Sequence, residues 1–202
     1  HRGPSSINWP IIMGSTRTGL TIFRPNDGLD EGPVILQKEC EIGPDETIGE
    51  VYFNKLFPMG VQAMLEAADL VVAGKHKQVV QDESQATYEG WCRAAEGRLD
   101  LAKPVDHVYN VIRGCNPAPG AWTTLAGKKI QIFDARKHGF RRFADVVGKI
   151  GEVSDVTADS FKVTAQGGLI EVLRARGEEG KKLSGGEFAR TQGLSNGTVL
   201  GT

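Results

Sequence analysis

The sequence has few cysteines, no long apolar run and almost no net charge, and each shortage excludes a class of protein. The three cysteines, Cys40, Cys92 and Cys115, are too widely spaced for a Cys-x-x-Cys zinc or redox motif, so we expect no metal site. A sparse, odd number of buried thiols also fits a cytoplasmic protein. The apolar runs are too short to span a bilayer and no signal peptide is recognisable, so we expect no membrane partner. The net charge of −1 provides no overall attraction to nucleic acid.

The chain is nevertheless long and apolar enough to fold. Its 202 residues, 40% of them hydrophobic, suffice for one domain or for part of a domain followed by a small second one. We expect the pattern to change at a polar, irregular segment. The sequence therefore predicts a first domain over residues 1–74, a linker over 75–102 and a second domain over 103–202.

The first part combines strands with a glycine-rich loop. Residues 5–13 are predicted to form a helix that closes at Gly14. Residues 20–23 are β-branched and aromatic and predict a strand, and a second strand begins at Val34 and runs toward Ile42. Between these strands, residues 26–32 contain the Asn, Asp and Gly residues that favour turns.

A long helical pattern follows the second strand. Thr47 and Glu50 have the spacing of a capping box, in which each side chain bonds to the backbone of the other residue. Apolar residues then recur near the helical period as far as Gly74, which is expected to end the helix. Pro58 is expected to divide this stretch into two helical pieces.

The second part begins with one helix and continues as short strands. Val105, Val108, Tyr109 and Ile112 lie on one face of a helix that is expected to start at Pro104 and end at Gly114. Strands are predicted over residues 130–133, 150–156, 161–165 and 169–174. A second capping-box pattern at Ser184 precedes a short helix over residues 188–192. Short strands with one short helix favour a small barrel of the OB type.

The loop between the first two strands is the main candidate site. It carries Asp27 and Asp30 beside Gly28 and Gly32. Loops at strand ends bind ligands in many α/β proteins, and glycine lets the backbone approach a flat heterocycle closely. An ordinary Asp/Gly turn has the same composition, so spacing alone leaves both interpretations open.

Several motifs in a fixed order resemble the formyltransferase family. They are Arg2-Gly3-Pro4-Ser5-Ser6-Ile7-Asn8-Trp9, Gly19-Leu20-Thr21-Ile22-Phe23, Asp27-Gly28-Leu29-Asp30-Glu31-Gly32, Val34-Ile35-Leu36-Gln37-Lys38-Glu39-Cys40-Glu41, Ala86-Thr87-Tyr88-Glu89-Gly90, Ile112-Arg113-Gly114 and Pro119-Gly120-Ala121-Trp122. The resemblance covers residues 1 to about 135 in sequence and the remainder only in architecture. It implies an α/β fragment of the formyltransferase fold followed by a small OB-like β-barrel domain.

The resemblance also implies a reaction and a site. The family uses 10-formyltetrahydrofolate as formyl donor, without a metal, and its catalytic set is an Asn, a His and the Asp of the Gly-Leu-Asp-x-Gly loop. Only the last carries over, onto Asp30. The loop backbone at Asn26, Asp27, Gly28 and Leu29 would line the folate pocket. His1 falls at the position before the family's Arg-Gly pair and receives no catalytic role.

Several alternatives remain open at this level. The 10-formyltetrahydrofolate hydrolase branch is favoured, and methionyl-tRNA and amino-sugar formyltransferases are its rivals. A start in mid-motif indicates an N-terminally truncated and inactive chain, which would self-associate through an exposed apolar face. Arg136, Lys137 and His138, with Arg141, Arg142, Phe140 and Phe143, form a basic cluster that suits either RNA phosphates or, preferably, a solvated turn. A non-catalytic module that binds RNA or protein is therefore the second hypothesis, with tRNA a less favoured partner.

Overall fold

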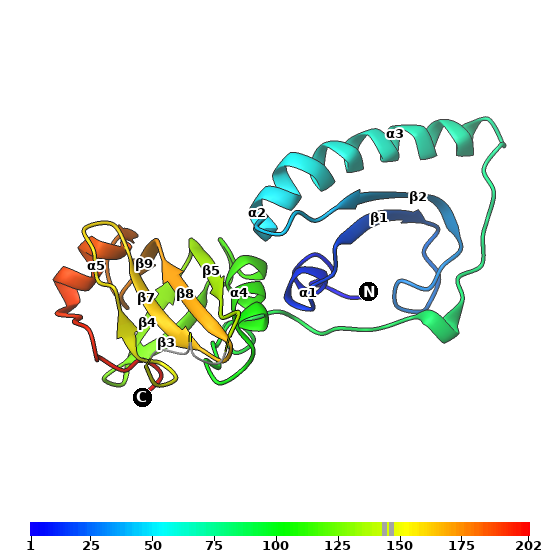
Figure 1. Cartoon of the computed structure of the whole chain (residues 1–202). Coiled ribbons are helices and arrows are strands. Elements are labelled where there is room, and N and C mark those ends of the chain that lie inside the picture. Colours follow the sequence, from blue (N-terminus) through cyan, green and yellow to red (C-terminus); the bar gives the residue numbers. More distant parts are fainter. Residues whose placement is uncertain (143–144, 146–147) are drawn as a thin grey trace. The chain divides into compact units, whose positions relative to one another are not determined.

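The computed structural model forms two compact units (Figure 1). It describes residues 1–142, 145 and 148–202. The first unit contains residues 1–11 and 15–91, and the second contains residues 12–14 and 92–202. None of the described helices is long and apolar enough to cross a membrane.

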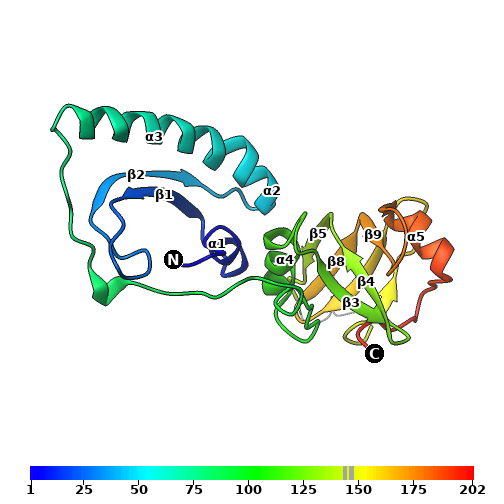
Figure 2. The same ribbon diagram turned by 180° about the vertical axis from the view of Figure 1, so that it is seen from behind.

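In the first unit, an antiparallel hairpin packs one face against a long helix (Figure 2). The elements are α1 (Asn8–Ile12), β1 (Arg17–Phe23), β2 (Val34–Glu41), α2 (Ile48–Val51) and α3 (Phe57–Val72). Helix α3 approaches the hairpin through small residues, because Ala63 and Ala67 are buried and a Cβ on Gly60 would lie 3.6 Å from the Leu20 side chain. A small core of Ile11, Ile42, Val51 and Leu56 fills the end of this layer.

The helical stretch after β2 consists of two α-helices that a π-helical turn joins. The capping box is present as predicted, since Thr47 accepts from the Glu50 amide and Glu50 bonds back to the Thr47 amide at 2.8 Å. The prediction of two helical pieces is confirmed, with Pro58 in the first turn of the second piece. A π-helical turn over Tyr52–Leu56 joins α2 directly to α3. The wider turn relieves the clash that a proline ring makes with the preceding turn of an α-helix.

The polar segment after α3 returns along the first unit. Its one regular element is a short 3₁₀ turn over Glu83–Gln85. Val79 exchanges two backbone hydrogen bonds with Val34, of 2.8 and 2.9 Å, which adds a single bridge to the start of β2. Further along, the Arg2 amide donates to the Thr87 carbonyl and the Glu89 amide donates to the Arg2 carbonyl. These bonds fix residues 79–89 around the open side of the unit.

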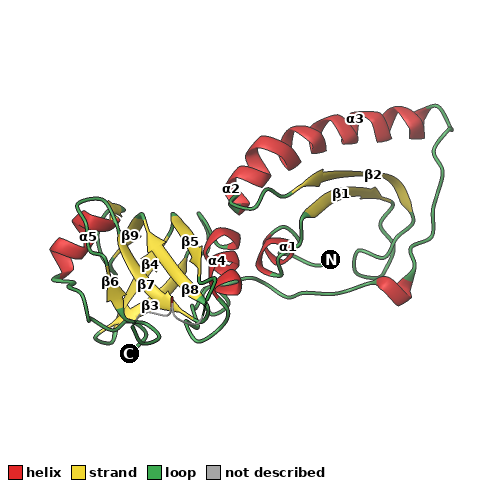
Figure 3. Ribbon diagram, in the orientation of Figure 1, coloured by secondary structure: helices red, strands yellow, loops and turns green. Residues whose placement is uncertain are grey.

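The second unit consists of one helix followed by two four-stranded sheets and a short helix (Figure 3). The elements are α4 (Val105–Gly114), β3 (Ala121–Leu125), β4 (Lys128–Ile132), β5 (Ala135–Gly139), β6 (Val153–Ser154), β7 (Phe161–Ala165), β8 (Gly168–Val172), β9 (Arg174–Arg176), β10 (Leu183–Ser184) and α5 (Gly185–Gln192). The strand orders are β10-β9-β4-β3 and β5-β8-β7-β6.

One long antiparallel ladder runs through both sheets. In the first sheet β4 pairs with β9, as in Ile132 opposite Ala175, and in the second β5 pairs with β8 in the same register, as in Ala135 opposite Val172. The bend between them is bridged by bonds from the Phe133 amide to the Arg174 carbonyl and from the Leu173 amide to the Asp134 carbonyl. Among the described strands the pairing does not close into a ring, so the OB-like barrel stays a prediction.

The core of the second unit lies on the inner faces of these sheets. Phe161, Ile170, Val172 and Phe188 are almost completely buried there, and the Phe161 and Phe188 rings stack with centroids 6.4 Å apart. Helix α5 carries Phe188 into this core, and its first turn is capped by the Ser184 hydroxyl, which accepts from the Glu187 amide.

The basic cluster is not a turn. Arg136, Lys137 and His138 belong to edge strand β5, where they are exposed, and the prediction of a solvated turn is wrong at these positions. Two of them have acidic neighbours, because Lys137 pairs with Asp106 on α4 and His138 pairs with Glu171. Phe143, assigned to the same cluster, lies outside the described residues. Local neutralisation reduces the cluster's attraction for phosphates.

We expect the core of the second unit to be sensitive to lost volume at Val172. Val172→Ala removes packing from a fully buried position, so the free energy of unfolding should fall by about 2 kcal/mol. The matched control is Val199→Ala, since Val199 is 39% exposed, and it should change stability by less than about 0.5 kcal/mol. Urea unfolding followed by circular dichroism measures both. Equal losses in the two variants would contradict this packing.

Candidate functional site

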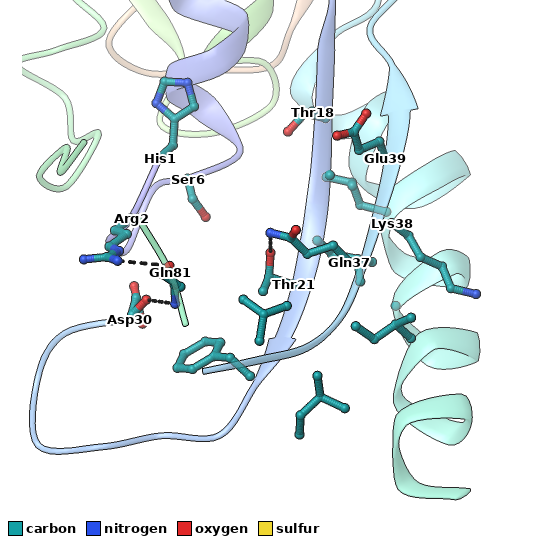
Figure 4. Close-up of a pocket in the computed structure, with 18 of the residues that line it drawn as sticks. His1, Arg2, Ser6, Thr18, Thr21, Asp30, Gln37, Lys38, Glu39 and Gln81 are labelled. Carbon is teal, nitrogen blue, oxygen red and sulfur yellow. Dashed lines mark hydrogen bonds between the residues drawn. The ribbon is translucent and has the colours of Figure 1, made fainter. Parts of the chain in front are cut away.

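A large groove opens in the first unit. Its volume is about 1670 Å³, and it is lined by both strands of the hairpin, by α3, by the N-terminal residues and by residues 79–86. The apolar part of the lining includes Ile7, Leu20, Phe23, Val34, Ile35, Leu36, Val61 and Leu65. Polar side chains from the opposite elements converge on one side of the groove (Figure 4). Apolar walls with a few convergent polar groups are typical of small-molecule sites.

Hydrogen bonds and a close backbone approach hold the loop that joins β1 and β2. The Arg24 amide donates to the Pro33 carbonyl at 3.0 Å, and the Gly28 amide donates to the Asn26 side chain at 3.2 Å. A Cβ on Gly32 would lie only 1.9 Å from the Arg24 carbonyl oxygen, so glycine is required there for the two ends to approach.

Asp30 is the loop residue that reaches the groove. It is partly buried, lines the groove and has a positive φ of 53°, a conformation that Asp tolerates better than most residues. The Gly3 amide donates to Asp30 Oδ2 at 3.0 Å, which ties the loop to the N-terminal segment. A carboxylate can accept about four hydrogen bonds, so this single bond leaves Asp30 able to accept more from a ligand.

Gln81 holds the backbone of the same loop. Its Nε2 donates to the carbonyls of Asp30 and Gly32, at 2.8 and 2.7 Å. Its Oε1 accepts from Arg2 at 3.0 Å. The amide side chain therefore links the loop to the N-terminal segment from a position 51 residues away along the chain.

An ion pair between Arg2 and Glu83 fixes the N-terminal end of the link that Gln81 makes. Arg2 makes two hydrogen bonds of 2.8 Å with the Glu83 carboxylate. The Glu83 hydrogen bond raises the pKa of Arg2 above its ordinary value, with smaller contributions from the charges of Glu31 and Asp30. The same hydrogen bond lowers the pKa of Glu83 below its ordinary value. Both groups are therefore charged at neutral pH, and Arg2 brings a fixed positive charge close to Asp30.

The hairpin contributes a polar wall opposite the face that packs on α3. Thr21 and Gln37 are cross-strand partners, and the Gln37 amide donates to the Thr21 hydroxyl at 3.1 Å. Both side chains line the groove, as does Ser6 (Figure 4). On the other face Lys38 pairs with Glu66 of α3 and points away from Asp30. The groove thus offers amide, hydroxyl and carboxylate partners without a metal-ligand set, because no group of three or more potential ligands occurs among the described residues.

The structure brings only part of the expected site together. Asp30 lines the groove, whereas Asn26, Asp27, Gly28 and Leu29 are exposed and are not among the lining residues. A pocket-lining role for these four residues stays a prediction. His1 lines the groove and pairs with Glu89 at 3.0 Å.

Sequence patterns did not identify Gln81, Arg2 or Gln37 as groove residues. Gln81 lies in a segment with no periodicity, so nothing local marks it as a contact of the distant loop. Gln37 could have been found, because its position on the solvent-facing side of a strand opposite Thr21 follows from the hairpin register.

Comparison with known families places both units in one group of proteins. Residues 1–68 match the family described as formyl transferase, and residues 92–193 match the one described as formyl transferase, C-terminal domain. A methionyl-tRNA formyltransferase from Syntrophus aciditrophicus is 36% identical over 201 residues, which is 100% of this chain and 63% of that protein. The human cytosolic 10-formyltetrahydrofolate dehydrogenase is 41% identical over 135 residues, 67% of this chain and 15% of that protein. The chain thus spans less than two thirds of the length of either relative.

Solved structures share the fold. HypX from Aquifex aeolicus, crystallised in complex with tetrahydrofolic acid, superposes with a TM-score of 0.73 at 22% identity and covers 95% of this chain and 33% of its own. An N-formyltransferase from Helicobacter canadensis, in complex with folinic acid and dTDP-3-aminofucose, gives a TM-score of 0.67 at 16% identity over 85% of this chain and 61% of its own. At these identities the likeness confirms the two-domain fold implied by the sequence motifs and carries no statement about ligands.

We expect Gln81 to control the order of the loop that carries Asp30. Gln81→Ala removes two hydrogen bonds to loop carbonyls, so amide hydrogen exchange at Arg24 and Gly3, whose amides bond within this network, should accelerate roughly tenfold. The control is Gln78→Ala, because Gln78 is an exposed glutamine three positions earlier whose side chain contacts His76 and not the loop of Asp30. Unchanged exchange in Gln81→Ala would show that the loop is held by other contacts.

Proposed function

Because this chain belongs to the formyl transferase family, we propose that its first unit forms part of the site for a formyl-tetrahydrofolate donor, with Asp30 at the reacting end. The observation that carries the proposal is the position of Asp30. It is the one acidic residue of its loop that lines the groove, and it is fixed there by the Gly3 amide and by Gln81.

The lining suits a reduced pteridine. Such a ring system is flat and carries N–H donors and carbonyl acceptors along its edge, so it needs apolar walls and a few groups of both kinds. The groove provides the apolar side chains of Phe23 and Ile35 and the polar groups of Thr21, Gln37 and Asp30. The backbone of residues 26–29 would contact the ligand if the exposed loop closes over it.

Asp30 suits proton transfer in this chemistry. Attack of water or an amine on the formyl carbon places negative charge on the formyl oxygen and leaves the nucleophile with a proton to lose. A partly buried carboxylate beside the nucleophile accepts that proton as a general base. The Gly3 amide, which donates to Asp30 Oδ2 at 3.0 Å, keeps this carboxylate oriented toward the groove.

Asp30 does not complete the catalytic set that the family resemblance implies. That set also requires an Asn and a His whose side chains stabilise the charge on the formyl oxygen, and no residue of this sequence matches their positions. We therefore propose that these 202 residues bind the donor but do not release its formyl group.

The proposal has two forms, which differ in the molecule that accepts the formyl group. Hydrolysis, with water as acceptor, is supported by the identity of 41% to the 10-formyltetrahydrofolate dehydrogenase over 135 residues. Transfer to methionyl-tRNA is the second candidate, and it is supported by the match to a methionyl-tRNA formyltransferase across the whole chain, including the second unit. A cytoplasmic location stays part of the proposal, since the similar dehydrogenases include both cytosolic and mitochondrial enzymes.

An apolar surface on α3 supports self-association. Phe57, Val61, Met64 and Leu65 are each more than half exposed and form an apolar stripe along α3 at the margin of the groove, whose lining includes all four. Monomeric soluble proteins rarely expose a contiguous apolar stripe of this kind. We propose that this stripe, called here the α3 apolar stripe, pairs with the same stripe of a second copy.

The folate proposal predicts a measurable role for Asp30. Calorimetry with folinic acid, a stable formyl-folate, should detect binding, and Asp30→Asn should weaken it about tenfold because a charged hydrogen-bond partner is lost. Asp69→Asn removes an exposed carboxylate outside the groove and should bind as the unchanged chain does.

Formyl release from 10-formyltetrahydrofolate should stay at the protein-free rate. Release that exceeds this rate and disappears in Asp30→Asn would overturn the proposed inactivity, whereas equal affinity of both variants would remove Asp30 from the site.

The α3 apolar stripe predicts concentration-dependent assembly. Leu65→Glu should shift the chain toward a monomer in analytical ultracentrifugation and reduce binding of a hydrophobic dye, because it places a charge in the stripe. Gln62→Glu adds the same charge at an exposed polar position of the same helix and should have little effect. A compact monomer that binds no dye before any substitution would refute the assembly.

A further inference from the structure

Two cysteines that the folate chemistry does not use lie in contact in the second unit. Cys92 Sγ and Cys115 Sγ are 3.9 Å apart, although 23 positions separate them in the sequence. Cys115 is fully buried at the end of α4, where its amide bonds to the carbonyls of the last turn. Cys92 is partly buried and is the first residue of the segment that enters the second unit.

The fold holds these two sulfur atoms close by fixing the backbone on both sides. After Cys92, the chain folds back in a turn in which the Arg93 amide donates to the Glu96 carboxylate at 2.8 Å. The indole of Trp122 on β3 then donates to the Ala94 carbonyl. On the other side, the Gly120 amide donates to the Cys115 carbonyl at 2.8 Å. The contact is therefore built by the turn and the helix end together rather than by one mobile side chain.

We propose that Cys92 and Cys115 form a reversible disulfide when the protein meets a small-molecule disulfide such as oxidised glutathione, with Cys92 as the attacking thiol and Cys115 as the resolving thiol. A disulfide requires the sulfur atoms to approach from 3.9 Å to about 2.0 Å, which a change of side-chain rotamer and a small adjustment of the exposed turn can provide.

The surroundings of the two thiols assign their roles. The hydrogen bond from Cys115 lowers the pKa of Cys92, against the smaller opposing effects of burial and of the Glu96 charge. The same hydrogen bond raises the pKa of Cys115 far above its ordinary value, and burial and the charges of Cys92 and Glu96 raise it further. The thiolate is the nucleophile in disulfide exchange, so the more accessible Cys92 reacts first.

The exchange balances in two steps. The Cys92 thiolate attacks one sulfur of the external disulfide, forms a mixed disulfide and releases one small thiolate, which takes up the proton that Cys92 lost. Cys115 then loses its proton to water or to a released thiolate, attacks the Cys92 sulfur and expels the second small thiol. The two protein thiols together lose two electrons. The external disulfide gains these electrons and becomes two thiols.

The third cysteine provides an internal control. Cys40 lies in the first unit, and burial raises its pKa above the ordinary value. It is partly buried, as Cys92 is, and packs beside the core of Ile11 and Val51. Low reactivity at Cys40 beside high reactivity at Cys92 would distinguish a site-specific reaction from general oxidation.

The test uses the whole chain under native conditions. The reduced protein is incubated with oxidised glutathione, quenched by alkylation and analysed by peptide mass spectrometry, in parallel with Cys92→Ser, Cys115→Ser and Cys40→Ser. The unchanged chain and Cys40→Ser should lose two hydrogens and yield a linked Cys92–Cys115 peptide, and dithiothreitol should reverse the change. Cys115→Ser should instead accumulate a stable glutathione adduct on Cys92, because the resolving thiol is missing.

A second measurement does not depend on the buried substitution. In the unchanged, reduced chain, brief exposure to iodoacetamide should alkylate Cys92 roughly tenfold faster than Cys115 and Cys40. Linked peptides that contain Cys40, equal alkylation of all three cysteines, or a chain that keeps all its thiols after native oxidation would each overturn the proposal. None of these outcomes bears on folate binding, which is measured separately at Asp30.

Discussion

The candidate site depends on one side chain that satisfies two backbone carbonyls. Gln81 bonds to the carbonyls of Asp30 and Gly32 and thereby holds an exposed loop in a conformation with positive φ at Asp30. Such a conformation costs free energy and persists only where surrounding contacts fix it. Arg2 extends the link to the N-terminal segment, so three distant parts of the chain meet at Asp30, at its backbone carbonyl and at its carboxylate.

The first unit buries little of its own apolar surface. A two-stranded sheet with one helix is marginal by itself, and here the helix uses its smallest residues toward the sheet. Its larger residues, including Phe57 and Leu65, stay more than half exposed beside the groove. This packing of α3 opens a wide groove for a ligand. The same packing leaves an apolar surface that favours association.

The sequence predicts those features that rest on local patterns. The amphipathic spacing of Val105 and Ile112 defines α4, and the turn-rich residues around Asp30 locate the loop. Contacts between distant segments are not encoded in any local period, which is why Gln81 was missed. Strand β5 was missed for a related reason. Its Arg136, Lys137 and His138 lack an apolar alternation, and the strand exists because the ladder that begins in the neighbouring sheet continues through it.

That shared ladder has a mechanical consequence for the second unit. Because the pairing of β4 with β9 passes without a change of register into the pairing of β5 with β8, neither sheet can separate its strands without pulling on the other. The hydrogen bonds at Phe133 and Leu173 continue this pairing across the bend. We therefore expect a twist of one sheet to be transmitted to the other across this bend.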